Sequence, residues 1–276
     1  MAPLRVGKVV SKMKKLLALY VVGIAAMMAV LPAAKAGTIA LWTFEDGTVG
    51  NPAGTVTATV SGQDGTALNG PLYVGGVKTA FGNQGLSLNG VNQNVHIPTT
   101  FGGPLDLTGS FTLEVGIVHG SGQGFPIFMG GILPGQDPYY LFVGSDGSVS
   151  FQTYLGGPTG FISSAPGALV SGELQHIAAV FDTSGPDNFM YLYVDDILVA
   201  NQNVGSNTIA YTDPDTDLWF GSVDNNQFGF YNGILTDVRI SDMALTPSQF
   251  FAVPEPGMVA VFGLGLLGIG LARRRV

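Results

Sequence analysis

Residues 175–201 read QHIAAVFDTSGPDNFMYLYVDDILVAN. The apolar runs at 175–182 and 188–194 are separated by Ser, Gly, Pro and Asp, which are turn-forming residues. The pair Asp195-Asp196 then separates the second run from residues 197–201, and aspartate tolerates the backbone of a two-residue hairpin turn. This stretch therefore predicts successive short β-strands joined by tight turns.

The same pattern extends over most of the chain. At residues 111–117, Phe, Leu, Val and Ile occupy alternate positions with Thr112 and Glu114 between them, as in a strand with one buried face. The expected strands are residues 38–44, 55–60, 72–81, 94–97, 110–119, 139–143, 148–154, 175–182, 188–194, 197–201, 218–221 and 233–240. We find no long amphipathic helix and no fixed-period repeat between them. We therefore expect an all-β fold, a single jelly-roll β-sandwich.

Composition excludes several kinds of chemistry. The 276 residues include no Cys and only three His, so disulfides, thiol nucleophiles and thiolate metal centres are excluded. Charged residues make up 11% of the chain, and there are 41 glycines. Charge is therefore well below that of an average soluble domain and glycine well above it, which again favours many tight turns.

Charge is distributed unevenly along the chain. Between residues 37 and 253 only Lys78 and Arg239 are basic, against eighteen acidic residues, so this stretch carries a formal charge of −16. Such a surface repels phosphate backbones, so we expect no nucleic-acid partner. It suits divalent cations or neutral polymers.

The first 36 residues have the pattern of a secretory signal peptide. A basic stretch at 12–15 precedes an apolar run at 16–31, and Ala34-Lys35-Ala36 fits the small-x-small cleavage rule. We expect cleavage after Ala36, so that Gly37 begins the mature chain. An uncleaved membrane anchor is the alternative.

The end of the chain contains three parts in order: Pro254-Glu255-Pro256, an apolar run of 16 residues at 257–272, and Arg273-Arg274-Arg275. A helix of this length spans about 24 Å, less than the ~30 Å hydrocarbon core of a bilayer. The arginines should stay cytoplasmic by the positive-inside rule. Residues 253–276 therefore predict a short membrane helix that follows an exported domain at 37–252.

This ending closely resembles the PEP-CTERM sorting signal of Gram-negative bacteria. The resemblance implies an exosortase-type processing protease as a partner, and a link to exopolysaccharide and biofilm. It implies a protein that is tethered transiently to the inner membrane and then reaches the cell envelope or the exterior. A plain tail anchor is the alternative.

A second resemblance covers the exported block. Its motifs are LWTFEDG at 41–47, GLSLNG at 85–90, VHIP at 95–98, GSFTLEV at 109–115, QHIAAVFD at 175–182, MYLYVDD at 190–196, YNGILTDVRI at 231–240 and ALTP at 244–247. In this order they resemble the laminin-G-like, concanavalin A-like jelly-roll family. Gln175 stands where the family usually has Trp, Asp196 where it has Gly, and Thr236-Asp237 where it has Asp-Glu.

Arg239 is the only arginine of the exported block. It lies within an apolar strand, where an unpaired charge is costly. We expect a carboxylate partner, either Asp237 or Glu114. An exposed arginine on an edge strand is the alternative.

Calcium is the cofactor that the acidic residues favour. Asp213, Asp215 and Asp217 alternate along one loop, and carboxylate oxygens are ligands that calcium prefers. The loop lacks the Gly and distal Glu of an EF-hand, so a solvated acidic loop is the alternative. In the resembling family some members bind calcium between the first and last strands, which here implies Glu45, Asp46 and Asp237.

No catalytic motif occurs in the exported block. Laminarinase-type enzymes of the resembling fold carry a Glu-x-Asp-x-x-Glu strand that supplies an acid/base and a nucleophile, but the three glutamates, Glu45, Glu114 and Glu173, do not form it. A pair of Asp residues from distant strands is the alternative. No Gly-x-Ser-x-Gly sequence is present. His96, His119 and His176 each lie in a strand, where packing or surface roles are more common than catalysis. We expect no enzyme activity.

Sugar binding is the other possibility; the alternatives are that the loops of a charge-poor chain use Asn and Gln only for their polarity, and that Trp219, within a strand run, belongs to the core. Amide-rich loops at 92–94, 201–203 and 225–227 can hydrogen-bond to hydroxyls, and Tyr139, Tyr140 or Trp219 can stack on sugar rings. We therefore expect an exported, envelope-sorted, non-catalytic module that binds carbohydrate or serves as an exopolysaccharide or biofilm matrix component. The alternatives are a glycoside hydrolase or lyase of the same fold, and a purely structural surface protein.

Overall fold

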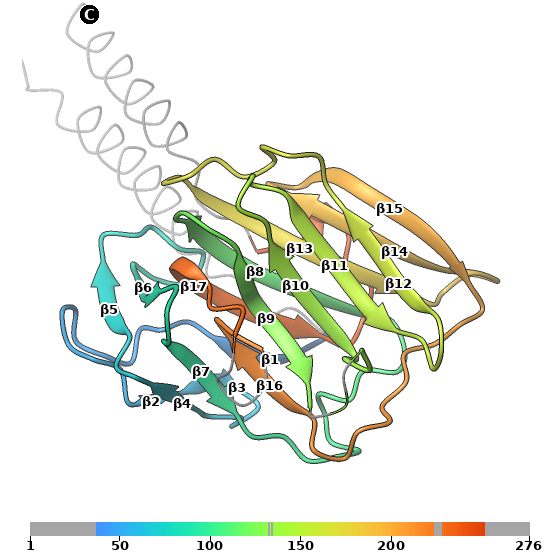
Figure 1. Ribbon diagram of the computed structural model, residues 1–276, viewed down its shortest axis with the longest axis horizontal. Coiled ribbons are helices and arrows are strands. Elements are labelled where there is room, and N and C mark those ends of the chain that lie inside the picture. Colours follow the sequence, from blue (N-terminus) through green and yellow to red (C-terminus); the bar gives the residue numbers. More distant parts are fainter. Residues whose placement is uncertain (1–36, 132, 134, 224–227, 252–276) are drawn as a thin grey trace, which may run out of the picture. The chain divides into compact units, whose positions relative to one another are not determined.

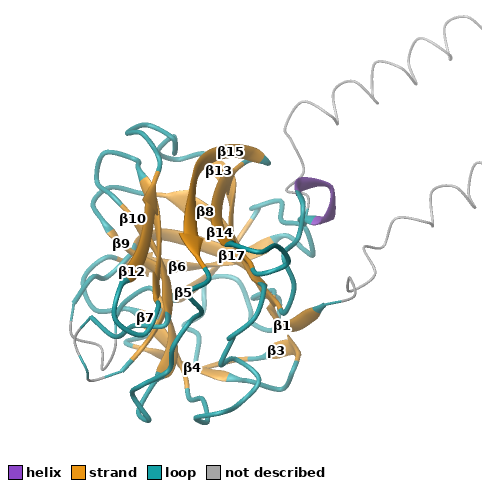
Figure 2. Ribbon diagram, turned by 90° about the vertical axis from the view of Figure 1, so that its right-hand side faces the viewer, coloured by secondary structure: helices purple, strands orange, loops and turns teal. Residues whose placement is uncertain are grey.

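The computed structural model describes residues 37–131, 133, 135–223 and 228–251. They form two antiparallel β-sheets packed face to face (Figures 1 and 2), which confirms the all-β jelly-roll sandwich. The predicted signal peptide and the predicted membrane helix lie outside these residues. No helix among the described residues has the length and hydropathy to cross a membrane.

Within the described residues, sheet A has nine strands. Its main path runs β15-β14-β13-β8-β17-β1-β3, and β6 pairs with both β17 and β5. The strands are β1 (Thr38–Trp42), β3 (Ala58–Val60), β5 (Leu72–Gly75), β6 (Gln84–Asn89), β8 (Phe111–His119), β13 (Leu174–Asp182), β14 (Asn188–Val194), β15 (Ile197–Gly205) and β17 (Asn232–Ser241).

In the part of the chain that the structure describes, sheet B has eight strands in the order β12-β11-β10-β9-β16-β7-β4-β2. They are β2 (Thr55–Val56), β4 (Gly65–Leu68), β7 (Asn94–Ile97), β9 (Gly124–Gly130), β10 (Tyr139–Val143), β11 (Val149–Tyr154), β12 (Thr159–Ser163) and β16 (Asp217–Phe220). Figure 1 shows β9, β10 and β11 lying over β8 and β13 of sheet A.

The core lies between the two sheets. Trp42 of β1 contacts Phe220 of β16 edge to face, with ring centroids 5.0 Å apart. Phe111 of β8 reaches Tyr139 of β10 at 5.4 Å. Both pairs join one sheet to the other, and all four side chains are buried. The outer faces of sheets A and B therefore point in opposite directions.

Several strands differ from the sequence expectation. The expected strand at 55–60 is two strands, because the chain crosses from sheet B to sheet A at Thr57, whose backbone N–H is donated to Asp46 Oδ2 at 2.7 Å. The strand expected at 72–81 ends at Gly75. Strands β4, β6, β9 and β12 were not expected at all.

The hairpin between β14 and β15 confirms the predicted two-residue turn. Asp195 and Asp196 have φ angles of 49° and 64°, as a type I′ turn requires. Asp195 also accepts hydrogen bonds from the His176 backbone N–H at 2.8 Å and from Gln175 Nε2 at 2.9 Å. The turn aspartate thereby ties the hairpin to β13.

A C-terminal strap, residues 244–251, covers the part of the outer face of sheet A around β8 and β13, and contains the 3₁₀ turn η2 (Pro247–Gln249). Strap residues Leu245 and Phe250 pack on Ala178 and Val180 of β13. Because the strap covers this face, Glu114 of β8 is fully buried although it lies on the polar side of the alternating pattern.

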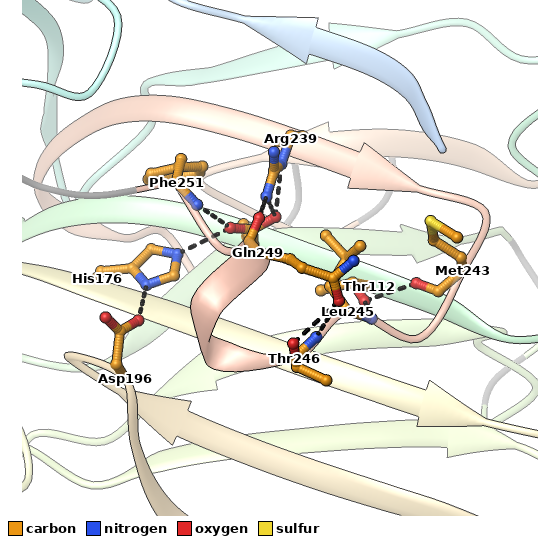
Figure 3. A network of polar contacts seen from close by, with 10 residues as sticks. Thr112, His176, Asp196, Arg239, Met243, Leu245, Thr246, Gln249 and Phe251 are labelled. Atoms are coloured by element: carbon orange, nitrogen blue, oxygen red, sulfur yellow. Dashed lines mark hydrogen bonds and ion pairs between the residues drawn. The ribbon is translucent and has the colours of Figure 1, made fainter. Parts of the chain in front are cut away.

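Glu114 is the carboxylate partner of Arg239. Figure 3 labels Arg239, His176 and Phe251, which contact this carboxylate. It accepts hydrogen bonds from Arg239 Nε at 2.5 Å and from Nη2, and its other oxygen accepts the Phe251 backbone N–H at 2.8 Å. Arg239 Nη2 also donates to the Gln249 carbonyl at 3.0 Å, and His176 Nε2 lies 3.3 Å from Glu114 Oε1. One buried ion pair thus holds the end of the strap. Of the two partners expected, Glu114 is correct and Asp237 is not.

Candidate functional site

Of the three acids expected to bind calcium between the first and last strands, two contact one segment of the chain and the third contacts another. Glu45 Oε1 accepts the backbone N–H groups of Asn83 and Gln84 at 2.6 and 2.7 Å. Asp237 Oδ2 accepts those of Ala80 and Phe81 at 2.8 and 3.3 Å. Both acids therefore bind one segment, residues 79–84.

Asp46, the third acid of this set, faces elsewhere. Its two oxygens bind the Thr57 N–H at 2.7 Å and the Tyr73 hydroxyl at 3.0 Å. It therefore stabilises the crossing between β2 and β3, and only Glu45 and Asp237 come together.

The carboxyl group of Asp237 lies in an unusual environment. Its Oδ1 is buried and has no hydrogen-bond partner. Burial, and secondarily the charge of Glu45, raise the pKa of Asp237 to about 7, although the hydrogen bonds from residues 79–81 act in the opposite direction. A free, buried carboxylate oxygen next to a second carboxylate fits a hard cation such as calcium. Calcium binding by Asp237 and Glu45 stays a prediction.

The loop acids Asp213, Asp215 and Asp217 also have separate roles. Asp213 is buried and accepts the N–H groups of Leu133 and Asp215 at 2.8 and 3.0 Å. Asp217 accepts the Thr99 N–H at 2.7 Å and binds His96 Nε2 at 2.8 Å. Within the described part of the chain, no three His, Asp or Glu side chains are grouped to hold a metal ion.

The amide-rich loops have mainly structural roles. In the first, Gln93 Nε2 donates to the Asn69 and Gly70 carbonyls at 3.2 and 3.0 Å, and Asn94 Nδ2 donates to Ser222 at 2.7 Å. In the second, Asn203 binds Asp187 at 3.0 Å. Residues 225–227, the third loop, lie outside the described residues.

A row of mostly aromatic side chains crosses the outer face of sheet B. The strand registers place Phe161, Gln152, Tyr140, Phe128, Trp219 and His96 directly opposite one another on β12, β11, β10, β9, β16 and β7. We call these six residues the sheet B row. Their neighbours along each strand point into the core.

The members of the row contact one another. His96 stacks on Trp219 at 4.2 Å with an interplanar angle of 21°, and Phe128 stacks on Tyr140 at 6.0 Å. The Tyr140 hydroxyl donates to Gln152 Oε1 at 2.6 Å. Burial, and secondarily the charge of Asp137, raise the pKa of Tyr140 to about 12, so the hydroxyl remains a donor at neutral pH.

Exposure varies along the row. Phe128 and Trp219, in the middle, are only 4% and 5% exposed. Phe161, at one end, is 50% exposed, and the His96 side chain, at the other, is 29% exposed. Tyr140 and Gln152 are half-buried. The ends of the row are therefore accessible to a ligand, while its middle is a packed base.

Part of this row was predictable from the sequence. Tyr140 and Trp219 were expected as stacking candidates, but so was Tyr139, which is fully buried and donates its hydroxyl to the Leu105 carbonyl. Phe128 was not expected, because β9 was not recognised as a strand. The alternation of Ile127 and Met129 around Phe128 was the available signal, and Pro126 obscured it.

A sequence profile of the concanavalin A-like lectin/glucanases superfamily matches residues 88–250, more than half of the chain. The chain belongs to this superfamily. A second profile, the PEP-CTERM protein-sorting motif, matches residues 252–275. That motif indicates export and sorting to the cell envelope, and implies processing by exosortase-type machinery. It begins at the residue after Phe251, where the strap of this superfamily member ends.

Solved structures of three other proteins share the fold. A Trypanosoma rangeli sialidase in complex with sialic acid is 16% identical, with a TM-score of 0.55, over 80% of this chain and 33% of the sialidase. Domain 4 of a GH43 extracellular arabinanase from Geobacillus stearothermophilus, in complex with arabinotriose, is 15% identical, with a TM-score of 0.54, over 78% of this chain and 97% of that domain.

The binding domain of botulinum neurotoxin serotype D is 10% identical, with a TM-score of 0.53, over 77% of this chain and 50% of that chain. This superfamily member thus spans about one third of the sialidase and half of the toxin chain. At such identities the likeness establishes the fold alone. A search of curated proteins gave no match.

Proposed function

We propose that this protein is an exported, envelope-sorted, non-catalytic module that binds neutral carbohydrate chains on the outer face of sheet B. The observation that carries the proposal is the sheet B row, in which side chains of six neighbouring strands form one continuous line. Aromatic rings stack on the apolar faces of sugars, and the polar groups between them hydrogen-bond to hydroxyls.

The polar groups of the row are suited to this role. Gln152 supplies an amide and Tyr140 a hydroxyl at the Phe161 end, and His96 and Asp217 form a polar pair at the other end. The formal charge of −16 between residues 37 and 253 disfavours anionic polymers by charge repulsion. A neutral glycan is therefore the ligand class that we propose.

The comparisons support the proposal at the level of the fold. The arabinanase domain holds arabinotriose and the sialidase holds sialic acid. The sorting motif supports delivery to the envelope, where exopolysaccharide is a neighbouring polymer, and a role in an exopolysaccharide or biofilm matrix is part of the proposal.

Glycan binding predicts a result for two ring variants. Tyr140→Ala and Phe161→Ala should each weaken retention by a neutral polysaccharide about tenfold, since each removes a stacking surface. The measurement is affinity electrophoresis in gels that contain dextran, linear arabinan or anionic alginate. Val91→Ala is the matched control, because Val91 is 68% exposed and lies outside the row. Equal retention of all variants, or preference for alginate, would contradict the proposal.

A glycoside hydrolase is the second candidate function. Asp217 lies opposite Gly130 in the β9–β16 register, and a Cβ on Gly130 would lie 2.6 Å from Asp137 Oδ1. The Asp137 carboxylate therefore lies beside Gly130, and Asp217 lies on the strand that pairs with Gly130, where its carboxylate binds His96. Paired carboxylates perform glycoside hydrolysis. Release of reducing ends that disappears in Asp137→Asn and Asp217→Asn would favour this function over simple binding.

The sorting motif predicts the mass of the mature protein. We expect a chain that begins at Gly37 and lacks residues 257–276, because the short Gly-rich run is a poor permanent anchor and the terminal arginines stop it from crossing. Replacing Pro254, Glu255 and Pro256 by Ala should leave the tail attached and hold the protein in the inner membrane. The control variant Glu173→Ala should lose its tail as wild type does. Intact-mass measurement decides, and a wild-type chain that retains residues 257–276 would be a plain anchored protein.

A further inference from the structure

A second aromatic line lies on the opposite side of the molecule. Phe189, Tyr191 and Tyr193 occupy alternate positions of β14 and point to the outer face of sheet A, while Met190 and Leu192 between them enter the core. We call these three residues the β14 strip. Phe189 and Tyr191 are stacked at 5.8 Å with an interplanar angle of 15°, and Tyr191 and Tyr193 are 6.5 Å apart.

The strip has an accessible side and a fixed side. Across β15, exposed Asn203 and Asn201 lie opposite Phe189 and Tyr191. On the strap side, Phe250 meets Tyr193 edge to face at 5.2 Å. The strap is held by the buried Glu114–Arg239 pair, so the rings are supported by a fixed base.

The neighbours of the strip on β13 are small. Val180 lies opposite Tyr191, and Ala178 lies opposite Tyr193. Both are buried against the strap residues Leu245 and Phe250, whereas the rings of the strip are half-buried. A ligand that lies along β14 therefore meets the three rings, two amides and Leu198.

The chemistry of the strip points to one class of occupant. Among the described residues, the hydroxyls of Tyr191 and Tyr193 have no hydrogen-bond partner, so both are available. On β15 the side chains opposite the strip are Asn203, Asn201 and Leu198. The acids next to it in sequence are Asp182, Asp187, Asp195 and Asp196, and β13, β14 and β15 contain no Lys or Arg. Rings, free hydroxyls and amides without a cation fit a neutral glycan and do not fit an anionic polymer or an anionic membrane.

From this geometry we propose that the β14 strip is a second site for a neutral glycan chain, so that one molecule binds two chains on opposite faces and cross-links them. The proposal rests on the proposed function, because it assumes that the sheet B row binds the first chain. The outer faces point apart, so one short oligosaccharide cannot contact both sites. Cross-linking a polymer is then a direct consequence of two sites on one rigid sandwich.

The test uses the full chain in a non-ionic detergent without sugar headgroups. The probes are dextran and linear arabinan, and the measurements are turbidity with the polymer and retention in affinity gels. Wild-type protein should be retained by the polymer in the gel and should make a solution of the polymer turbid. Short oligosaccharides of the same sugar should remove the turbidity. The double variant Tyr191→Ala/Tyr193→Ala should still be retained, about tenfold more weakly, but should produce no turbidity.

Two further variants separate the possible outcomes. The double variant Tyr140→Ala/Phe161→Ala should also be retained in the gel without producing turbidity. The double variant Tyr191→Phe/Tyr193→Phe keeps the rings, so its turbidity should lie between that of wild type and that of Tyr191→Ala/Tyr193→Ala. If the alanine variant of the strip clouds the polymer as wild type does, the second site is wrong and the sheet B row stands. If wild type is retained by neither polymer, the proposed function itself fails. Circular dichroism confirms that each variant is folded.

Discussion

Replacing Arg239 with methionine is expected to lower the free energy of unfolding by about 3–5 kcal/mol. Arg239 and Glu114 are 2% and 0% exposed, so the variant leaves a buried carboxylate without its counter-charge. The Phe251 N–H and nearby His176 offset this only in part. Urea denaturation at neutral pH measures the loss, and the urea dependence of the free energy should stay unchanged if the fold is retained.

Two control variants make the result specific. Lys78→Met removes the other basic residue of the domain, which is exposed, and should change stability by less than about 0.5 kcal/mol. The double variant Glu114→Leu/Arg239→Met replaces the pair by apolar side chains and should recover most of the loss, as is common for buried ion pairs. A loss below about 1 kcal/mol in the single variant would show that the pair does not hold the strap.

Asp237 should make the domain less stable as the pH rises. The pKa of its carboxyl is raised from 3.8 to about 7 by burial, so the folded state holds the proton more tightly than the unfolded state does. This stabilisation is complete below pH 3.8 and is lost as the pH rises through 7. The shift corresponds to a loss on the order of 4 kcal/mol, which Asp237→Asn should abolish because its amide does not ionise.

The measurement is urea denaturation of wild type and Asp237→Asn at pH 4.5, 6, 7 and 8.5. The free energy of unfolding of Asp237→Asn, relative to that of wild type, should increase as the pH rises across this range. Val91→Ala is the control, because Val91 is exposed and does not ionise, so its difference from wild type should not change with pH. Parallel curves for wild type and Asp237→Asn would mean that Asp237 is ionised at all these pH values.

Calcium adds a second readout at the same residue. An ion at the free oxygen of Asp237 would stabilise wild type by about 2.7 kcal/mol at a hundredfold excess over its Kd. The gain should increase above pH 7, where the carboxylate is ionised, and should be absent from Asp237→Asn. Sodium chloride at equal ionic strength controls for screening of the acidic surface. No change in melting temperature with calcium at pH 8.5 would refute the calcium prediction.

Strands with clear alternation were predictable, and those interrupted by special residues were not. Residues 188–194 were predicted with the bounds of β14. Strand β9 was missed because Pro126 normally excludes a central strand. Its place in the sheet is permitted by a register shift in β10 between Leu141 and Val143, and β16 pairs only with Phe128–Gly130, beyond the proline.

The candidate site was predictable only in fragments. Tyr140 and Trp219 were named from their aromatic character, yet they lie 79 positions apart in the sequence. Their alignment with Phe128 depends on the registers of three strands. The expected calcium triad at Glu45, Asp46 and Asp237 does not form a single site. Glu45 and Asp46 are adjacent in the sequence but bind different segments, and this depends on the tertiary structure.

The sequence alone determined the local features of this protein: the Asp195-Asp196 hairpin, the alternating core positions, the need of Arg239 for a carboxylate, and the sorting motif at 252–275. These depend on neighbouring residues or on a charge that cannot be buried alone. Only the tertiary structure decided that Glu114 is the partner, that Asp237 keeps a free buried oxygen, and that the two aromatic lines lie on opposite faces. Each of these depends on strand register and strand order, which join residues that are far apart in the sequence.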